Sequence, residues 1–218
     1  STETKRLVRN YRDGASDIEG FVDDYAFLIQ GLLDLYEASF DVQWLEWAQT
    51  LQATQDKLFY DSSSAGYYSA TGNDPSILLR LKEDYDGAEP SPNSVSILNL
   101  LRLAQITAND QFDQQARKTL THFSESLTTQ PASAPQMLAA LNFSLVKAKQ
   151  IVFAAKPESK DFSALLRSLH KSFIPNKVVL LADGRVQDAT FDALREHLSE
   201  EAVLELTYAV ANYALHAT

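Results

Sequence analysis

The sequence predicts a mainly α-helical fold with a small β-α-β appendage. Three observations support this: apolar residues recur at helical spacing between residues 19 and 147, one helical pair is repeated further along, and the apolar period changes after Lys149. With 218 residues, 45% of them hydrophobic and 22% charged, the chain is long enough to bury a sizeable core. We therefore expect a globular protein rather than a disordered or fibrous one.

The first expected element is a pair of antiparallel helices. Between Glu19 and Thr54 the apolar residues follow the helical period, and the pattern breaks at Phe40 and Asp41, which predicts a tight turn there. Asp24 falls on a face that otherwise looks inward, so its carboxylate needs a partner. Two interpretations remain open: Asp24 belongs to a site, or it lies in the first helical turn, where free N–H groups favour an anion.

The same helical pair recurs. A shift of 68 residues places the turn Phe40-Asp41 on Ala108-Asn109. It also aligns Leu32 with Leu100, Leu35 with Leu103, Trp44 with Phe112, Ala48 with Ala116, and Leu51 with Thr119. A repeated hairpin that cannot bury its own apolar face is typical of an α-solenoid or an α/α toroid. We therefore expect a partial α/α toroid, with an inner helix from Asn93 to Thr107 and a third pair over residues 110–127 and 135–147.

The connection between the first two hairpins, residues 61–92, is too long for a bare loop. Its first part, Ala65 to Gly72, has aromatic residues bracketed by glycines and predicts a short β-hairpin. Its second part, Leu81 to Asn93, carries four carboxylates, a lysine and a tyrosine and leads directly into the inner helix. This second part is where we expect chemistry.

Crowded carboxylates are candidates for acid and base chemistry. A carboxylate pair at roughly 5 to 10 Å can hydrolyse a glycosidic bond, while aromatic rings stack on the sugar. The hypothesis assigns catalysis to Glu83, Asp84 and Asp86, and binding to Asp24, Tyr25, Tyr85, Glu89 and Asn93. The alternative is structural: Lys82 and Arg80 pair with Asp84 or Glu89, and the loop caps the helix.

The last third of the chain changes character. Short apolar runs at Ile151 to Ala155 and Val178 to Leu181 flank a helical segment, Phe162 to Phe173, and predict a β-α-β unit. Two further helices are expected between Ala189 and Ala217. The expected organisation is a helical-hairpin region over residues 1–147, a β-α-β appendage over 148–184 and a C-terminal helical pair over 185–218.

The charges are unevenly placed. The net charge is −10, and the window from Asp13 to Asp56 holds ten carboxylates and no Lys, Arg or His. The rest of the chain then balances, so no basic face is left for phosphates, and neither nucleic acid nor an anionic membrane is an expected partner. The acidic window is either a solvated helix face or a site for a cation or a sugar.

Several classes of site are excluded by composition. The absence of cysteine excludes disulfides, thiolate zinc sites and a Cys nucleophile. The four histidines are far apart, with none at i, i+4 to another, so no metal site is expected. Phosphate loops and dinucleotide fingerprints are also missing, so no cofactor is expected. No apolar run approaches the roughly 20 residues of a membrane span, which favours a soluble, cytoplasmic protein.

Three strings together resemble a known family: GFVDDYAFLIQGLLDLYE from Gly20, LKEDYDGAEPSPNS from Leu81 and PNKVVLL from Pro175. They are similar to the C-terminal part of the spermatogenesis-associated, thioredoxin-domain-containing proteins, whose bacterial relatives are known as domain of unknown function 255. The resemblance covers residues 6–184. It implies an α/α toroid like those of N-acylglucosamine 2-epimerases and six-hairpin glycosidases, and a link to carbohydrate metabolism by analogy of fold.

This chain departs from that family in two respects. The thioredoxin-like domain has no counterpart in the sequence, and the histidines of the epimerases have none at matching positions. The tail, from Phe191 to Ala211, is instead similar to a helical pair of carboxymuconolactone decarboxylase-like proteins, which implies packing or oligomerisation. The expected function is therefore a carbohydrate- or polyol-binding module. The alternative is a non-catalytic scaffold whose open flanks bind a partner chain or a second copy.

Overall fold

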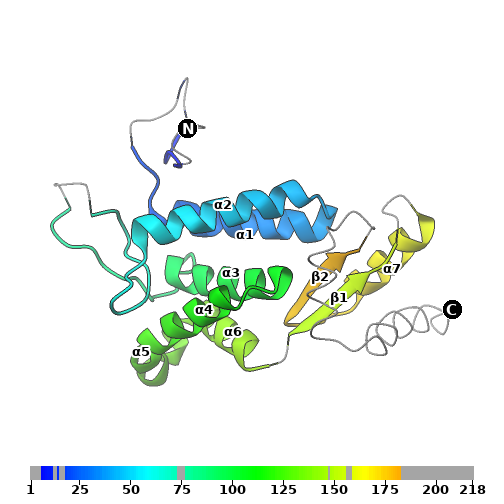
Figure 1. Cartoon of the computed structure of the whole chain (residues 1–218). Helices are drawn as coiled ribbons and strands as arrows, with labels where there is room; N and C mark the ends of the chain where they lie inside the picture. Colours follow the sequence, from blue (N-terminus) through cyan, green and yellow to red (C-terminus); the bar gives the residue numbers. More distant parts are fainter. Residues whose placement is uncertain are drawn as a thin grey trace. The chain divides into compact units, whose positions relative to one another are not determined.

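In a computed structural model of the chain, the described residues are 6–11, 14, 18–72, 77–146, 148–155 and 159–182. They divide into two compact units, one of residues 6–105 with 109–146 and the other of 106–108 with 148–182. Helices dominate the first unit, and the second contains two strands and a helix (Figure 1). The prediction of a mainly α fold with a β-α-β unit is confirmed.

The first helical hairpin consists of α1 (Val22–Ser39) and α2 (Val42–Phe59), which lie side by side (Figure 1). At the turn, Phe40 adopts a left-handed conformation with φ of 57°, and its N–H donates to the Tyr36 carbonyl at 2.6 Å. The Asp41 carboxylate then accepts from the Gln43 N–H at 3.1 Å, which caps α2. The predicted break at Phe40 and Asp41 is therefore confirmed.

The second hairpin consists of α3 (Pro92–Thr107) and α4 (Asp110–His122), and its turn repeats the first one locally. Ala108 is left-handed with φ of 51°, and the Asn109 side chain accepts from the Gln111 N–H at 3.0 Å. Three of the five aligned pairs are buried in both copies, Trp44 and Phe112 are both half-buried, and Leu35 is exposed where Leu103 is buried. The repeat deduced from the 68-residue shift is therefore a repeat of structure.

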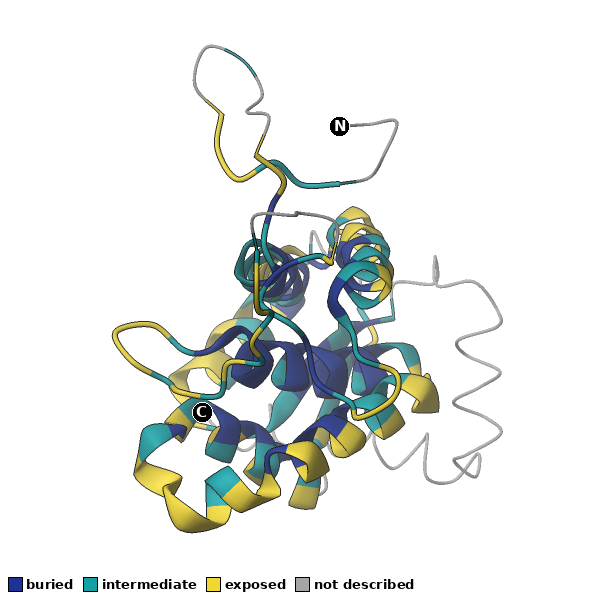
Figure 2. Cartoon of the chain, turned by 90° about the vertical axis from the view of Figure 1, so that its left-hand side faces the viewer, coloured by how far each residue is buried: buried dark blue, intermediate teal, exposed yellow. Residues whose placement is uncertain are grey.

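Helix α3 is the central element of the first unit. It is buried along almost its whole length from Pro92 to Ala104, as the dark blue helix in the middle of Figure 2 shows. Polar side chains connect it to the first hairpin: Asn99 Nδ2 donates to the Ala26 carbonyl at 2.8 Å, and Gln55 Nε2 donates to Ser96 Oγ at 2.9 Å. Buried polar groups need such partners, and these bonds give the three helices one fixed arrangement.

The rest of the first unit is formed by α5 (Ser124–Thr129), a short 3₁₀ turn (Pro131–Ser133) and α6 (Pro135–Leu145). The predicted helix over residues 110–127 is interrupted at Phe123, whose ring is buried. Met137, Ala140 and Phe143 are the buried residues of α6.

The second unit contains a β-α-β element made of β1 (Lys149–Phe153), α7 (Lys160–Lys171) and β2 (Lys177–Leu181). The two strands pair in parallel, with Lys149 opposite Lys177. Ser159 caps α7 by accepting from the Phe162 N–H at 3.1 Å. The Phe153 and Phe162 rings meet edge to face, with their centroids 5.5 Å apart.

The predicted β-hairpin at Ala65 to Gly72 is wrong. Only an isolated antiparallel bridge between Tyr60 and Tyr67 forms in this described segment. Asp61 closes a tight turn instead, because its carboxylate accepts from the Ser63 N–H at 2.9 Å and its own N–H donates to the Gly66 carbonyl.

Two further expectations concern the division of the chain into regions and the presence of membrane-spanning helices. The helical pair predicted over 185–218 lies outside the described residues, and the three-region division stays a prediction. Among the helices within the described ranges, none combines the length and apolar character that crossing a membrane requires.

Candidate functional site

A pocket of about 830 Å³ lies in the first unit beside the start of α1. The connection between the hairpins forms one side of it, and α1 with the segment before it forms the other. The lining residues are Arg9, Phe21, Val22, Asp23, Phe27, Ser69, Ala70, Ile77, Glu83, Tyr85, Gly87, Ala88, Glu89, Pro90, Ser91 and Pro92. We refer to it as the α1 pocket.

Three of the eight site residues predicted from the sequence line the α1 pocket: Glu83, Tyr85 and Glu89. Tyr85 is 68% exposed, so its ring is open to a ligand. Phe21 and Phe27 from the α1 side are half-buried and line the same space. The pocket therefore combines aromatic surface with carboxylates.

Arg9 and Asp23 form the charged end of the α1 pocket. Arg9 Nη1 lies 3.1 and 3.2 Å from the two Asp23 carboxylate oxygens. The Arg9 guanidinium also stacks over the Phe21 ring, with its Cζ atom 4.8 Å from the ring centroid. The hydrogen bond that Arg9 donates to Asp23 is the main cause that raises the pKa of Arg9. Neither residue was singled out from the sequence, although Asp23 is the direct neighbour of the predicted Asp24.

Asp86 has a different role from the predicted one. Its Oδ1 accepts from the Ser91 N–H at 2.8 Å, and its Oδ2 accepts from the Gln136 N–H at 2.7 Å at the start of α6. The Asp86 N–H donates to the Ser133 carbonyl at 2.8 Å. These bonds tie the loop to α6 and occupy the carboxylate with backbone donors. Catalysis by Asp86 stays a prediction, and the contacts seen are structural.

The buried Asn93 side chain links two segments of the connection by hydrogen bonds. Its Oδ1 accepts from the Tyr67 N–H at 2.7 Å, and its Nδ2 donates to the Tyr67 carbonyl at 3.0 Å and to the Glu83 carbonyl at 2.9 Å. The side chain is fully buried and has used its acceptor and both donors within the protein. It therefore holds Glu83 beside the pocket without lining it.

Asp24 and Tyr25 also lie behind the lining of the pocket. Asp24 Oδ2 accepts from the Phe21 N–H at 2.8 Å, and it lies 3.2 Å from Arg9 Nη1. This is the first-turn alternative left open by the sequence. The Tyr25 ring is 1% exposed, its hydroxyl accepts from the Leu7 N–H at 2.9 Å, and burial raises its pKa. Direct binding by either residue stays a prediction.

Asp84 is not among the residues that line the α1 pocket, and the alternative in which Lys82 pairs with Asp84 or Glu89 is wrong. Lys82 Nζ instead contacts Asp61 Oδ2 at 2.9 Å, Ser64 Oγ at 2.7 Å and the Ala65 carbonyl at 2.6 Å.

These contacts change the acidity of two neighbouring groups. Hydrogen bonds from Ser63, Lys82 and Ser64 hold the pKa of Asp61 far below its ordinary value. The pKa of His122 is lowered, chiefly by burial and then by the charge of Lys82.

A half-buried carboxylate, Asp56 on α2, was not found by the sequence reasoning. Its Oδ1 accepts from the Tyr67 hydroxyl at 2.6 Å, from Gln52 Nε2 at 2.9 Å and from Gln115 Nε2 at 2.8 Å. Burial is the largest cause of the raised pKa of Asp56, and it also raises the pKa of Tyr67 well above the ordinary value. Helical spacing could have indicated Asp56, since it lies four residues after Gln52 and three before Phe59, and both of these residues are buried.

The residues that line the α1 pocket suit the binding of a polar ligand. Within the described ranges, no group of three or more His, Asp or Glu side chains is arranged to hold a metal ion. The α1 pocket offers aromatic faces, the Glu83 and Glu89 carboxylates and the Arg9–Asp23 ion pair. Such a set can hold a polar ligand that also presents an apolar face.

Comparison with known proteins identifies relatives. No protein-family model matches the chain. The chain is 50% identical to spermatogenesis-associated protein 20 of Rattus norvegicus over 168 residues and 49% identical to that of Homo sapiens over 166 residues, in each case 76% of this chain. Most of this chain is homologous to part of spermatogenesis-associated protein 20. An uncharacterized protein of Caenorhabditis elegans is 35% identical over 167 residues.

The match to spermatogenesis-associated protein 20 confirms the family resemblance that the three strings carried. The chain spans about a fifth of the length of these curated relatives, with 21% of the rat protein covered. Among solved structures, a GH76 alpha-mannanase of Bacteroides thetaiotaomicron is similar with a TM-score of 0.44 and 16% identity, over 56% of this chain and 31% of that one.

Proposed function

We propose that this chain is a binding module for a small carbohydrate or polyol, with the α1 pocket as its binding site. One observation carries the proposal: three aromatic side chains and three carboxylates line the same pocket of about 830 Å³. The aromatic side chains are Phe21, Phe27 and Tyr85, and the carboxylates are Asp23, Glu83 and Glu89.

The chemistry of a sugar matches these two kinds of surface. The C–H face of a sugar ring is apolar and packs on an aromatic ring, and the exposed Tyr85 ring offers such a face. Sugar hydroxyls donate hydrogen bonds to carboxylate oxygens, and Glu83 and Glu89 have exposed side chains on the pocket wall.

The proposal covers binding and does not extend to turnover. Of the three carboxylates predicted to be catalytic, only Glu83 lines the α1 pocket. Asp86 is engaged by backbone N–H groups, and Asp84 is not among the lining residues. Turnover would need Glu83 and a second lining carboxylate, such as Glu89, to face each other across the bound ligand as general acid and base.

The test is a titration of the purified chain with mono- and disaccharides and polyols, followed by saturation-transfer NMR and by thermal shift. A ligand that binds the native state raises the Tm by mass action. Tyr85→Ala is expected to weaken binding about tenfold or more because the stacking face is lost. Tyr11→Ala is the matched control, since Tyr11 is an exposed tyrosine outside the pocket.

Two results would contradict the proposal. One is the absence of any sugar or polyol signal with a folded sample. The other is a signal that persists unchanged in Tyr85→Ala and in the double variant Glu83→Gln with Glu89→Gln, because the ligand would then bind elsewhere.

A second candidate function is a scaffold that binds a second copy of the chain. It is favoured by exposed leucines on the connection: Leu78 is 98% exposed and Leu79 is 72% exposed. Light scattering tests it. A dimer that dissociates in the double variant Leu78→Ser with Leu79→Ser supports the scaffold, and a monomer at all concentrations contradicts it.

A further inference from the structure

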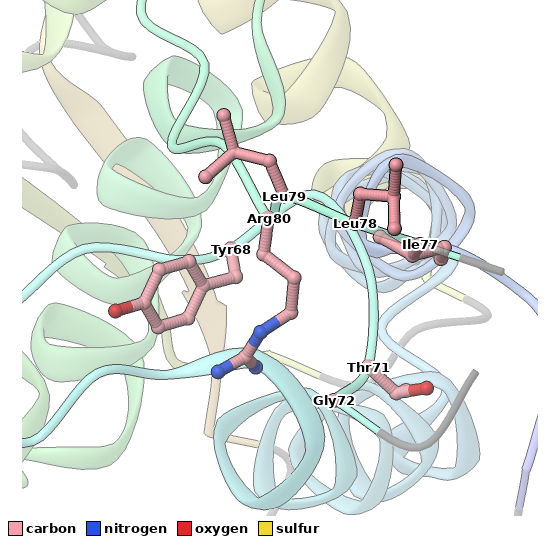
Figure 3. Close-up of a pocket in the computed structure, with 7 residues that line it drawn as sticks. All are labelled: Tyr68, Thr71, Gly72, Ile77, Leu78, Leu79 and Arg80. Carbon is pink, nitrogen blue, oxygen red and sulfur yellow. The ribbon is translucent and has the colours of Figure 1, made fainter. Parts of the chain in front are cut away.

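A second, smaller pocket of about 290 Å³ lies in the connection between the two helical hairpins. Two short segments line it, Tyr68 with Thr71 and Gly72 on one side, and residues 77–80 on the other (Figure 3). It shares a single lining residue, Ile77, with the α1 pocket. We refer to it as the Arg80 pocket.

Arg80 lies at the centre of this pocket, and its guanidinium is held by stacking. Its Cζ atom lies over the Tyr68 ring, 4.1 Å from the centroid (Figure 3). The ring is itself held in place, because the Tyr68 hydroxyl donates to Asp61 Oδ2 at 2.9 Å. A guanidinium that stacks through its face keeps its N–H groups, which lie in its plane, for another partner.

Those N–H groups have no acceptor among the described residues. Four other arginines, Arg6, Arg9, Arg102 and Arg117, each pair with a carboxylate of the chain. In the described part of the protein, Arg80 forms neither an ion pair nor a hydrogen bond. A positioned arginine in a hollow, with its donors unused, is a ready recognition group for an oxyanion.

The surroundings add an apolar wall. A Cβ atom at Gly72 would lie 3.5 Å from Arg80 Cζ and Nη1, an ordinary van der Waals distance, so Gly72 lies directly beside the guanidinium. Thr71 also lines the pocket, with its hydroxyl pointing away from the Arg80 guanidinium (Figure 3). Ile77 and Leu78 line the opposite side, and Leu78 is almost fully exposed. The pocket thus combines a cation with aliphatic surface.

We propose that the Arg80 pocket binds a small organic oxyanion, a carboxylate or phosphate that carries a short aliphatic group. The oxyanion accepts from the Arg80 guanidinium as a bidentate partner, and the aliphatic group packs against Ile77 and Leu78. This site is separate from the proposed sugar site, because its recognition group, Arg80, does not line the α1 pocket.

The proposal is tested by isothermal titration of the full chain with sodium hexanoate, hexyl phosphate and, as an uncharged control, 1-hexanol. The titrations are done at about 0.15 M salt, which screens the long-range repulsion by the acidic protein. The expected result is that the two anions bind and 1-hexanol does not. Arg80→Ala is expected to weaken anion binding about tenfold or more, because a charge-assisted bidentate pair is lost.

Two variants make the result specific. Arg80→Lys is expected to bind with intermediate affinity, since it keeps the charge and loses the planar fork. Arg117→Ala is the matched control, because Arg117 is an exposed arginine paired with Asp113 and outside the pocket. If Arg80→Ala does not fold, Arg80→Gln, with its longer polar stem, takes its place.

The proposal is overturned if neither anion binds the native chain, if 1-hexanol binds as tightly as hexanoate, or if Arg117→Ala weakens binding as much as Arg80→Ala. A preference for hexanoate or for hexyl phosphate that disappears in Arg80→Ala supports the site and identifies its oxyanion. Tyr85→Ala is expected to leave both anions bound, which separates this proposal from the proposed sugar site.

Discussion

The strongest test of the structure is the removal of the Asn93 side chain. The sequence predicted Asn93 to be a binding residue, whereas the structure has it fully buried with three hydrogen bonds to the backbone of the connection. Asn93→Ala leaves the N–H and carbonyl of Tyr67 without their partner. The Tyr67 side chain is also fully buried, so we expect water to replace these two bonds poorly.

The expected loss follows from counting these bonds. Each of the two Tyr67 groups costs about 1 to 2 kcal/mol when it is left buried without a partner. The Glu83 carbonyl belongs to a residue with an exposed side chain, so water can replace that bond at little cost. The free energy of unfolding of the first unit should therefore fall by about 3 kcal/mol in Asn93→Ala.

Urea unfolding followed by tryptophan fluorescence measures this loss. Both tryptophans of the chain, Trp44 and Trp47, lie on α2, so their fluorescence reports on the first unit. Asn142→Ala is the matched control, because Asn142 is an exposed asparagine on α6, and its removal should change the free energy of unfolding by less than about 0.5 kcal/mol. The reasoning is refuted if Asn93→Ala is as stable as Asn142→Ala.

Three further predictions concern stability. Burial raises the pKa of Asp56 above its ordinary 3.8, so the folded state binds this proton more tightly than the unfolded state does. Protonated Asp56 therefore adds to the free energy of unfolding at low pH. This contribution is lost as the pH rises from 3.8 through the raised pKa. Asp56→Asn should remove that decline, seen as urea midpoints that depend less on pH. Asp86→Ala should lower the free energy of unfolding by about 2 kcal/mol because α6 loses its cap, whereas Asp84→Ala should change it by less than about 0.5 kcal/mol in the same urea assay. Leu100→Ala should cost about 3 kcal/mol by leaving a cavity in the buried α3, and the exposed Leu145→Ala should be nearly neutral; equal midpoints would contradict the assignment of α3 to the core.

The helices and the β-α-β unit were predictable because they depend on local spacing. The alternation of apolar and polar residues identifies the buried face of each helix without knowledge of its partner. The repeated turn was also predictable, since Asp41 and Asn109 each cap the helix that begins at the next residue. The break at Phe123 was missed because its ring is held by burial in the core and not by a local turn signal.

The site was predictable only in part. The sequence located the acidic connection, and Glu83, Tyr85 and Glu89 do line a pocket. It could not tell these residues from Asp86, because the partner that occupies Asp86 is the Gln136 N–H, 50 residues away. In the same way, Lys82 reaches back 21 residues to Asp61 rather than to the carboxylates beside it.

The sequence by itself therefore determined the elements of this protein, its helical hairpins, their repeat and the β-α-β unit. Only the tertiary structure decided which polar side chains are consumed as internal connectors, such as Asn93, Asp86 and Asp56, and which stay open to a ligand, such as Tyr85 and Arg80. The physical reason is that apolar burial follows a period along the chain, whereas a hydrogen bond or ion pair needs two particular groups within about 3 Å. That proximity is set by which distant segments the folded core brings together.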